Sequence, residues 1–317
     1  MINDKRGIEL SFSIILAIIA GAVILFLAIY AAIRFIDSGN LQGQTVAAKE
    51  LSIVFNPLEP GQETGKSTKA ELSMNTRLYT DCSESGNFGS ESFSLSQQTG
   101  MSKNWPKPGV PIKVNNKYIF SEDVEEGKTF YFFVKPFTMP FKVSGLIFLN
   151  AGTYCFNGAP EFIQQDLGQV ENVKFGNCTG KDISVCFGSN CNVSVYGTCS
   201  AGYCTSQYDQ GYVVKQGKTE YFTGNLMYAA IFSSPESYEC NFKRLMLRIE
   251  SVAELYSEET EFLSSRGCGD TAVTNLIRLS QAAQTASPSS PMSLNLLVDA
   301  ASKVDEQNSV KGGCQIY

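Results

Sequence analysis

Cysteine is the residue of this chain with the greatest capacity for chemistry, because histidine is absent. The chain has 317 residues, with 10 cysteines and no histidine. Without imidazole there is no Ser-His-Asp triad, no Cys-His nucleophile pair, no HExxH zinc site and no histidine-bound haem. The chemistry that remains is carried by thiolates, by carboxylate pairs or by a Ser-Lys pair.

Five cysteines form a repeating series. Cys178, Cys186, Cys191, Cys199 and Cys204 are separated by alternating intervals of 8 and 5 residues. Each shorter interval contains a glycine, which suits a hairpin tip closed by a disulfide, so we expect the pairs Cys186–Cys191 and Cys199–Cys204. A zinc site is the alternative, although zinc usually selects CxxC pairs or histidine. A catalytic thiolate needs a free cysteine, whereas an even number in an oxidising compartment favours disulfides. We therefore predict no metal and no cofactor.

Two other motifs contain reactive groups. The acidic run Ser121–Glu126 shows neither a recognisable glycosidase spacing nor the alternating ligands of a calcium loop, so we interpret it as a solvated loop. Gly65-Lys66-Ser67 resembles the end of a phosphate-binding loop, but Pro60 stands where that motif needs glycine, which argues against a nucleotide. A net charge of -6 without a basic cluster argues against nucleic acid. We assign no catalytic residue.

The elements that must position these residues begin with an apolar N-terminal segment. No charged residue occurs from Leu10 to Ile33, and a helix over this stretch would be about 36 Å long, enough to cross a hydrocarbon core of about 30 Å. The sequence therefore predicts a transmembrane helix, with a cleaved secretory signal as the alternative. Lys5 and Arg6 precede the segment, so the positive-inside rule predicts a single-pass protein of the cell membrane, with a cytoplasmic N-terminus and an outer C-terminal domain.

An outer location agrees with the cysteines and with two glycosylation sequons. All 10 cysteines follow the apolar segment, which suits an oxidising compartment. Asn177 and Asn192 each begin an N-x-[ST] sequon. The expected partners are the lipid bilayer and either other envelope proteins or further copies of the chain.

The outer part changes its hydrophobic period along the chain. Short alternating runs predict a sheet domain, interrupted by a helical pattern over 158–167. Since strands are expected on either side, over 154–156 and 173–175, the order predicts a βαβ unit and a parallel pair of strands. We divide the chain into an N-terminus and anchor (1–36), a juxtamembrane helix over 44–55 with a linker (37–68), a disulfide-braced sheet domain (69–234) and a helical unit (235–317).

The last part of the chain has a helical period throughout. The pattern predicts helices over 235–266 and 270–286 and a third helix after Pro291, which together form an antiparallel three-helix unit. In such a unit the ends of the first and third helices lie at the same pole. Cys268 and Cys314 follow these two ends, so we expect them to be paired. A mixed sheet with a terminal helical unit is an α+β arrangement.

Two groups of residues carry a resemblance to archaeal proteins. Lys5-Arg-Gly-Ile-Glu-Leu-Ser-Phe12 resembles the start of archaeal surface proteins with a class III, pilin-like signal segment, in which processing would follow Gly7. Four longer segments resemble an uncharacterised group of single-anchor surface proteins from small-genome archaea. The resemblance implies a single anchor and a surface location, and it transfers no site residue. The segments are KYIFSEDVEEGK, PFTMPFKV, YCFNGAPEFI and GNLMYAAIFSSPESYECNFKRLM.

These observations predict a membrane-anchored extracytoplasmic protein of the cell envelope that has a structural or interaction role. A pilin-like filament subunit is the first alternative. An envelope hydrolase that uses carboxylates or a Ser-Lys pair is the second, and no motif in the sequence identifies its residues.

Overall fold

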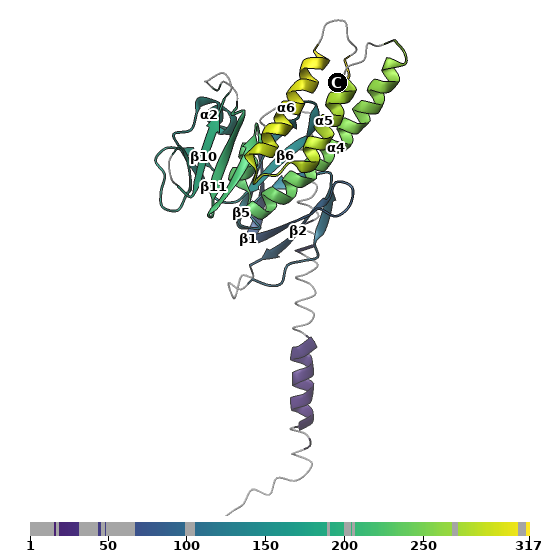
Figure 1. Ribbon diagram of the computed structural model, residues 1–317. Coiled ribbons are helices and arrows are strands. Elements are labelled where there is room, and N and C mark those ends of the chain that lie inside the picture. The colour runs from purple at the N-terminus through teal and green to yellow at the C-terminus, as the bar shows by residue number, and fades with distance from the viewer. Residues whose placement is uncertain are drawn as a thin grey trace, which may run out of the picture.

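The structure, a computed structural model, describes residues 16, 19–31, 44–45, 48, 67–98, 105–188, 191–199, 204, 207–267, 272–309 and 315–317. Two six-stranded mixed sheets are followed by a group of helices (Figure 1). This is an α+β arrangement, as the change of period along the sequence predicts.

The N-terminal segment differs from the prediction. Residues 19–31 form a helix whose large apolar side chains are between 51% and 68% exposed. In the part of the chain that the structure describes, no helix combines the length and the apolar character that a membrane crossing requires. The predicted transmembrane helix over Leu10–Ile33 is therefore wrong, because the described helix is shorter than the roughly 20 residues that a span needs. The rest of that segment, and Gly7 with its expected cleavage, lie outside the described residues.

The first sheet has the strand order β3-β2-β1-β5-β6-β4. Its neighbours are antiparallel except β4 and β6, which are parallel. The central strands β5 and β6 are apolar on both faces, because a small core covers one face and the main core of the molecule covers the other. The bounds are β1 Ser67–Ser83, β2 Ser90–Gln97, β3 Ile112–Asn115, β4 Tyr118–Phe120, β5 Val124–Thr138 and β6 Lys142–Asn150.

The second sheet has the order β12-β11-β10-β9-β7-β8. The helix α2 (Glu161–Leu167) connects β7 to its parallel neighbour β8, which confirms the predicted βαβ unit. The strands β9 and β10 are also parallel, whereas β10, β11 and β12 form an antiparallel meander. The bounds are β7 Tyr154–Asn157, β8 Val173–Phe175, β9 Ile183–Phe187, β10 Val193–Thr198, β11 Gln210–Lys215 and β12 Lys218–Thr223.

A short helix, α3 (Leu226–Phe232), contacts both sheets, and all its residues are buried. The three predicted C-terminal helices follow as α4 (Pro235–Ser264), α5 (Ala272–Thr285) and α6 (Pro291–Asn308). Both α4 and α6 begin with proline after a serine whose side chain accepts a hydrogen bond from the backbone N–H of the third helical residue. This capping stabilises a helix start and explains where the two helices begin. The main core runs without interruption from the sheets into these helices.

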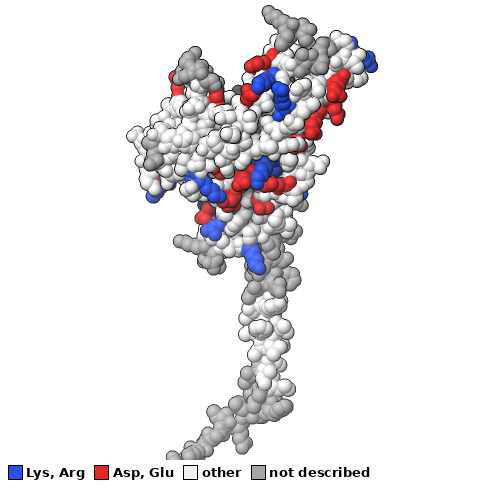
Figure 2. All heavy atoms as spheres, in the orientation of Figure 1, with Lys and Arg blue, Asp and Glu red and all other residues white. Residues whose placement is uncertain are grey.

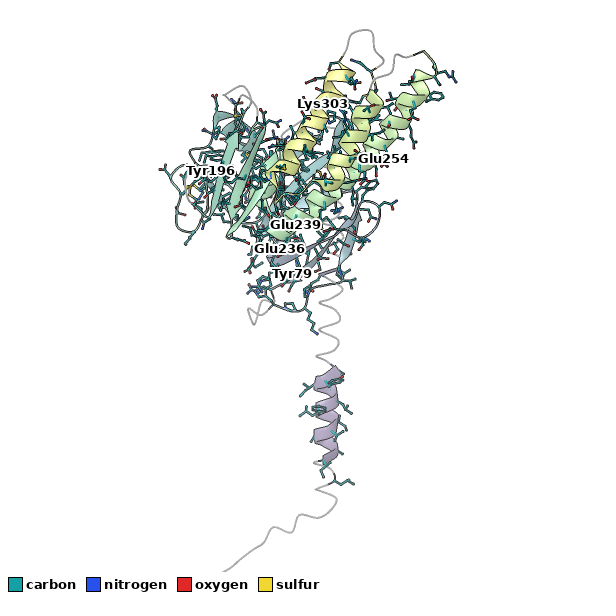
Figure 3. All side chains as sticks on the ribbon, viewed as in Figure 1. Tyr79, Tyr196, Glu236, Glu239, Glu254 and Lys303 are labelled. Atoms are coloured by element: carbon teal, nitrogen blue, oxygen red, sulfur yellow. A yellow bond between two sulfur atoms is a disulfide. The ribbon has the colours of Figure 1, made fainter. Side chains whose placement is uncertain are left out.

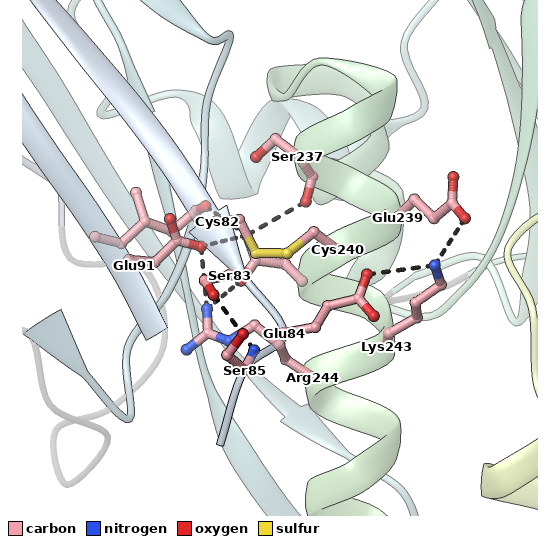
Figure 4. The surroundings of a disulfide bond; sticks show 12 residues. Cys82, Ser83, Glu84, Ser85, Glu91, Ser237, Glu239, Cys240, Lys243 and Arg244 are labelled. Atoms are coloured by element: carbon pink, nitrogen blue, oxygen red, sulfur yellow. Dashed lines mark hydrogen bonds and ion pairs between the residues drawn. A yellow bond between two sulfur atoms is a disulfide. The ribbon is translucent and has the colours of Figure 1, made fainter. Parts of the chain in front are cut away.

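A disulfide and a buried ion pair tie α4 to the first sheet (Figure 4). Cys82 at the end of β1 is bonded to Cys240, with 6.1 Å between the Cα atoms. One turn further along α4, Arg244 donates to Glu91 of β2 at 3.0 Å, and Asn241 donates to the same carboxylate at 2.6 Å. The side chains of Arg244 and Glu91 are 0% and 3% exposed, so this ion pair is shielded from water.

The predicted pair Cys268–Cys314 lies outside the described residues. The helices α4 and α6 end on the same side of the helical unit, as the pairing requires (Figure 1). The pairing stays a prediction.

Candidate ligand-binding cleft

Three tyrosines lie side by side across the antiparallel meander of the second sheet. Tyr196 of β10 is the register partner of Tyr212 of β11, and Tyr212 is the partner of Tyr221 of β12. Directly paired residues point to the same face of a sheet, so the three side chains form a row that we call the tyrosine ladder. The ring centroids are 4.8 Å apart for Tyr196 and Tyr212, which are stacked, and 5.8 Å apart for Tyr212 and Tyr221.

The alternation of side chains fixes this ladder in place. Val195, Val213 and Phe222 point to the opposite face and are no more than 1% exposed, because they belong to the main core. The tyrosines of the ladder are only half-buried. The sheet therefore holds the row of rings rigidly on its outer face.

Two glycines on the face opposite the ladder allow aromatic rings to approach the strands. Gly197 and Gly211 are register partners on β10 and β11. A Cβ atom at Gly197 would lie 2.2 Å from the ring of Tyr208, and one at Gly211 would lie 2.5 Å from the ring of Phe222. A Cβ atom at Gly211 would also lie 2.1 Å from the backbone oxygen of Tyr196. Such distances are far below contact distance, so glycine is required at both positions for the rings and the neighbouring strand to come this close.

The ladder and the start of α6 border a cleft of about 730 Å³, whose lining also includes residues of the opposite face of the sheet such as Val195 and Phe222. Figure 3 shows Tyr196 on the second sheet, and Figure 2 shows few charged side chains over β10 and β11. No residue that the structure places along the cleft carries a charge; their polar groups are hydroxyls, amides and backbone atoms. The lining residues are Gly158, Phe187, Gly188, Val195, Tyr196, Gly197, Thr198, Tyr208, Gln210, Gly211, Tyr212, Tyr221, Phe222, Pro291, Leu294 and Asn295.

The two short disulfides lie next to the cleft. Cys186 is bonded to Cys191 and Cys199 to Cys204, which are the pairs expected from the spacing. Cys186 and Cys199 adjoin Phe187 and Thr198, which line the cleft. With Cys82–Cys240 and Cys155–Cys178, the described residues contain four disulfides, which indicates an oxidising environment.

The acidic run Ser121–Glu126 is only in part the solvated loop that we predicted, because Asp123 and Glu126 are exposed, whereas Glu125 lies in β5 and is buried. Glu122 pairs with Lys215, and Asp123 accepts a hydrogen bond from Ser234 at 2.5 Å. Glu125 is 6% exposed and accepts a hydrogen bond from the backbone N–H of Ala151 at 2.8 Å. These carboxylates contact the second sheet, the start of α4 and the end of β6, and the burial of Glu125 results from long-range contacts that the local sequence does not show.

Lys135 and Asp166 form a second contact of low exposure, which joins the first sheet to α2. The Nζ of Lys135 on β5 lies 2.5 Å from Asp166 of α2, and the hydroxyl of Tyr228 donates to the other oxygen of Asp166 at 2.7 Å. The side chain of Lys135 is 9% exposed. Both Asp166 oxygens are satisfied within the protein, so we assign this group a structural role.

Burial of Glu125 makes the stability of the fold depend on pH. Burial raises the pKa of Glu125 from 4.5 to about 7. A raised pKa means that the folded state binds the proton more tightly, so the stabilisation is complete below pH 4.5 and disappears as the pH rises through 7. We expect this group to lower the free energy of unfolding by on the order of 3 kcal/mol between pH 4.5 and pH 8.

Glu125→Gln should reduce this loss, since glutamine does not titrate. Urea unfolding at several pH values measures the free energy of unfolding and therefore the size of this loss. The matched control is Glu126→Gln, because this neighbour pairs with Arg77 at 2.8 Å on the surface, where its side chain is 44% exposed. Equal pH slopes for the Glu125 variant and the unchanged protein would contradict the prediction.

The two sequon asparagines are exposed. Asn177 has a positive φ of 51° in the turn before Cys178. The side-chain oxygen of Asn192 accepts hydrogen bonds from the backbone N–H and the hydroxyl of Ser184, at 3.1 and 2.7 Å. Their glycosylation stays a prediction. Within the described residues, no three potential ligands among Asp, Glu, Cys and His gather in a way that could hold a metal ion.

The sequence contains a signal for the cleft that we did not use. Tyr196-Gly197 on β10 and Gly211-Tyr212 on β11 are mirror images of each other. Two antiparallel strands in register place such dipeptides opposite one another, tyrosine to tyrosine and glycine to glycine. The sequence alone does not give the register of the two strands, so it does not show whether the two tyrosines lie on the same face of the sheet.

Comparison with known proteins gives no relationship. The chain matches no protein-family model, and it has no significant match among curated proteins or solved structures. The resemblance to single-anchor archaeal surface proteins stays a prediction.

Proposed function

We propose that this protein is an interaction protein of the cell envelope, that it works in an oxidising compartment outside the cytoplasm, and that it holds its partner in the tyrosine cleft without altering it chemically. The single observation that carries the proposal is the uncharged, ring-lined cleft of about 730 Å³. Clefts of this size with aromatic walls and a few polar groups are the usual form of a ligand site.

Binding without turnover is supported by the composition of the lining. Acid-base catalysis requires a titratable side chain within hydrogen-bonding reach of the substrate. Among the described lining residues, the titratable groups are tyrosine hydroxyls, and burial raises the pKa of Tyr208. The raised pKa keeps the Tyr208 phenol protonated near neutral pH, which suits it to hydrogen bonding rather than to proton abstraction.

A sedimentation experiment tests this function. The oxidised protein is mixed with the envelope fraction of the cells that produce it, and the pellet and the supernatant are analysed. We expect the protein to sediment with the envelope, Tyr212→Ala to sediment less, and no soluble fragment to accumulate with time. The control is Tyr79→Ala, since Tyr79 lies on the first sheet, away from the cleft (Figure 3). Equal sedimentation of both variants, or steady release of fragments, would refute the proposal.

A second candidate, assembly of copies into a filament, is favoured by a different observation. The helix over residues 19–31 exposes its apolar side chains along its whole length. An apolar surface of this kind is stabilised when further copies of the helix pack against it. In the sedimentation experiment, pelleting of the protein without envelope material would favour this candidate.

A further inference from the structure

The polar groups around the cleft match a ligand that carries many hydroxyls. The hydroxyls of the tyrosine ladder make no hydrogen bond within the described part of the chain, and the same holds for the side-chain amides of Gln210 and Asn295. Phenols and amides each offer both donors and acceptors. A ligand hydroxyl also does both, so it can bind to any of these groups in either direction.

The absence of charge along the cleft selects against ions. An anionic or cationic ligand that enters a partly dry cleft loses hydration, and it needs an opposite charge to compensate. The residues that the structure places around this cleft provide none. The cleft therefore favours a neutral ligand.

The rings provide a second kind of contact. Tyr196, Tyr212 and Tyr221 lie on three adjacent strands, so their row extends over roughly 10 Å. Aromatic faces and edges attract flat apolar groups, and the faces of a pyranose ring are made of C–H groups. A row of this length accommodates about two sugar rings.

A peptide fits this surface less well. Peptides that bind to sheets normally use the free backbone groups of an edge strand. Here β10 and β11 are paired on both sides, and at the edge strand β12 the N–H of Tyr221 already donates to Pro288 at 2.7 Å. A ligand at the ladder therefore meets side chains rather than free backbone groups.

We infer that the ligand of the tyrosine cleft is a neutral saccharide chain, bound by the rings of the ladder and by the hydroxyls and amides beside it. This inference rests on the proposed function and specifies the class of ligand. It requires no covalent step, since the saccharide is bound and released unchanged.

Isothermal titration of the full, oxidised chain tests the inference. The probes are the hexasaccharides of glucose in its α- and β-linked forms, of mannose and of N-acetylglucosamine, with hexagalacturonate as the charged counterpart and decaproline as a neutral peptide. We expect at least one neutral hexasaccharide to bind, and hexagalacturonate to bind at least about tenfold more weakly or not at all.

Variants assign the binding to the ladder. Tyr212→Ala and Tyr196→Ala should each weaken the binding about tenfold, because each removes a ring, whereas Tyr212→Phe removes one hydroxyl and should weaken it about threefold. Tyr79→Ala is the matched control and should have no effect. Circular dichroism establishes that each variant is folded, and Tyr196 at the end of the ladder provides a second position if Tyr212→Ala fails to fold.

Three results would overturn the inference: no binding of any neutral hexasaccharide at 10 mM ligand (about the limit of weak binding), equal binding of hexagalacturonate, or binding that both ladder variants leave unchanged. A further result would overturn the inference: decaproline binds tightly, no saccharide binds, and Tyr212→Ala weakens the binding of decaproline. The ligand would then be a peptide and not a saccharide, and the proposed function would still be supported. If only the saccharide inference fails, sedimentation with the envelope still depends on Tyr212. If the proposed function fails, Tyr212→Ala sediments with the envelope as the unchanged protein does.

Discussion

Replacing both Cys82 and Cys240 with alanine should lower the free energy of unfolding by about 5 kcal/mol. The two cysteines are separated by 158 residues, and their bond restricts the unfolded chain more than a short loop does. Urea unfolding of the oxidised protein, followed by circular dichroism, measures the loss.

The matched control is the pair Cys199→Ala and Cys204→Ala. These cysteines are separated by 5 residues, so the same entropic argument predicts a loss of about 2 kcal/mol. Equal losses for the long and the short loop would show that restriction of the unfolded chain is not what makes Cys82–Cys240 stabilising.

Replacing Arg244 with methionine should lower the free energy of unfolding by about 4 kcal/mol. The guanidinium donates to Glu91, to the side-chain oxygen of Asn241 at 2.7 Å, and to the backbone oxygens of Phe88 and Lys117 at 2.9 and 3.0 Å. Methionine fills most of the volume but leaves these acceptors unpaired in a buried place, and unpaired buried acceptors are costly.

Lys243→Met is the control for this prediction, one residue earlier on α4. Lys243 pairs with Glu84 and Glu239 on the surface, where it is 45% exposed, and its removal should change the stability by less than about 1 kcal/mol. The double variant Arg244→Met with Glu91→Gln should recover part of the loss. In it, the neutral side chain of glutamine replaces the Glu91 carboxylate, which Arg244→Met alone leaves without its cation. A loss as large for Lys243→Met as for Arg244→Met would contradict the argument.

Local patterns predicted the elements that depend on local contacts. The βαβ unit follows from a helical period between two strands, and the helices α4, α5 and α6 follow from the helical period of the last part of the chain. The disulfides Cys186–Cys191 and Cys199–Cys204 follow from short spacing.

Features that depend on distant contacts were missed or wrong. The helix α3 is buried on all sides, so it lacks the one-sided pattern by which a helix is recognised. Glu125 lies in an acidic run that looks solvated, although the fold buries it. The apolar run Leu10–Ile33 predicted a membrane span that the described helix does not provide. The tyrosine ladder depends on the register of three strands, which the sequence does not specify.

The bond between Cys82 and Cys240 also determines how the chain responds to mechanical tension. When the two ends of the chain are pulled apart, the load passes from β1 to α4 through the covalent bond and bypasses every residue between them. That bypassed segment contains α3 and the whole second sheet, including the strands that carry the tyrosine ladder. Pulling can extend the segments before Cys82 and after Cys240 and can detach α6 from the cleft, but it cannot lengthen the ladder strands. A protein that held a partner under strain would therefore keep its binding surface intact while its ends stretched.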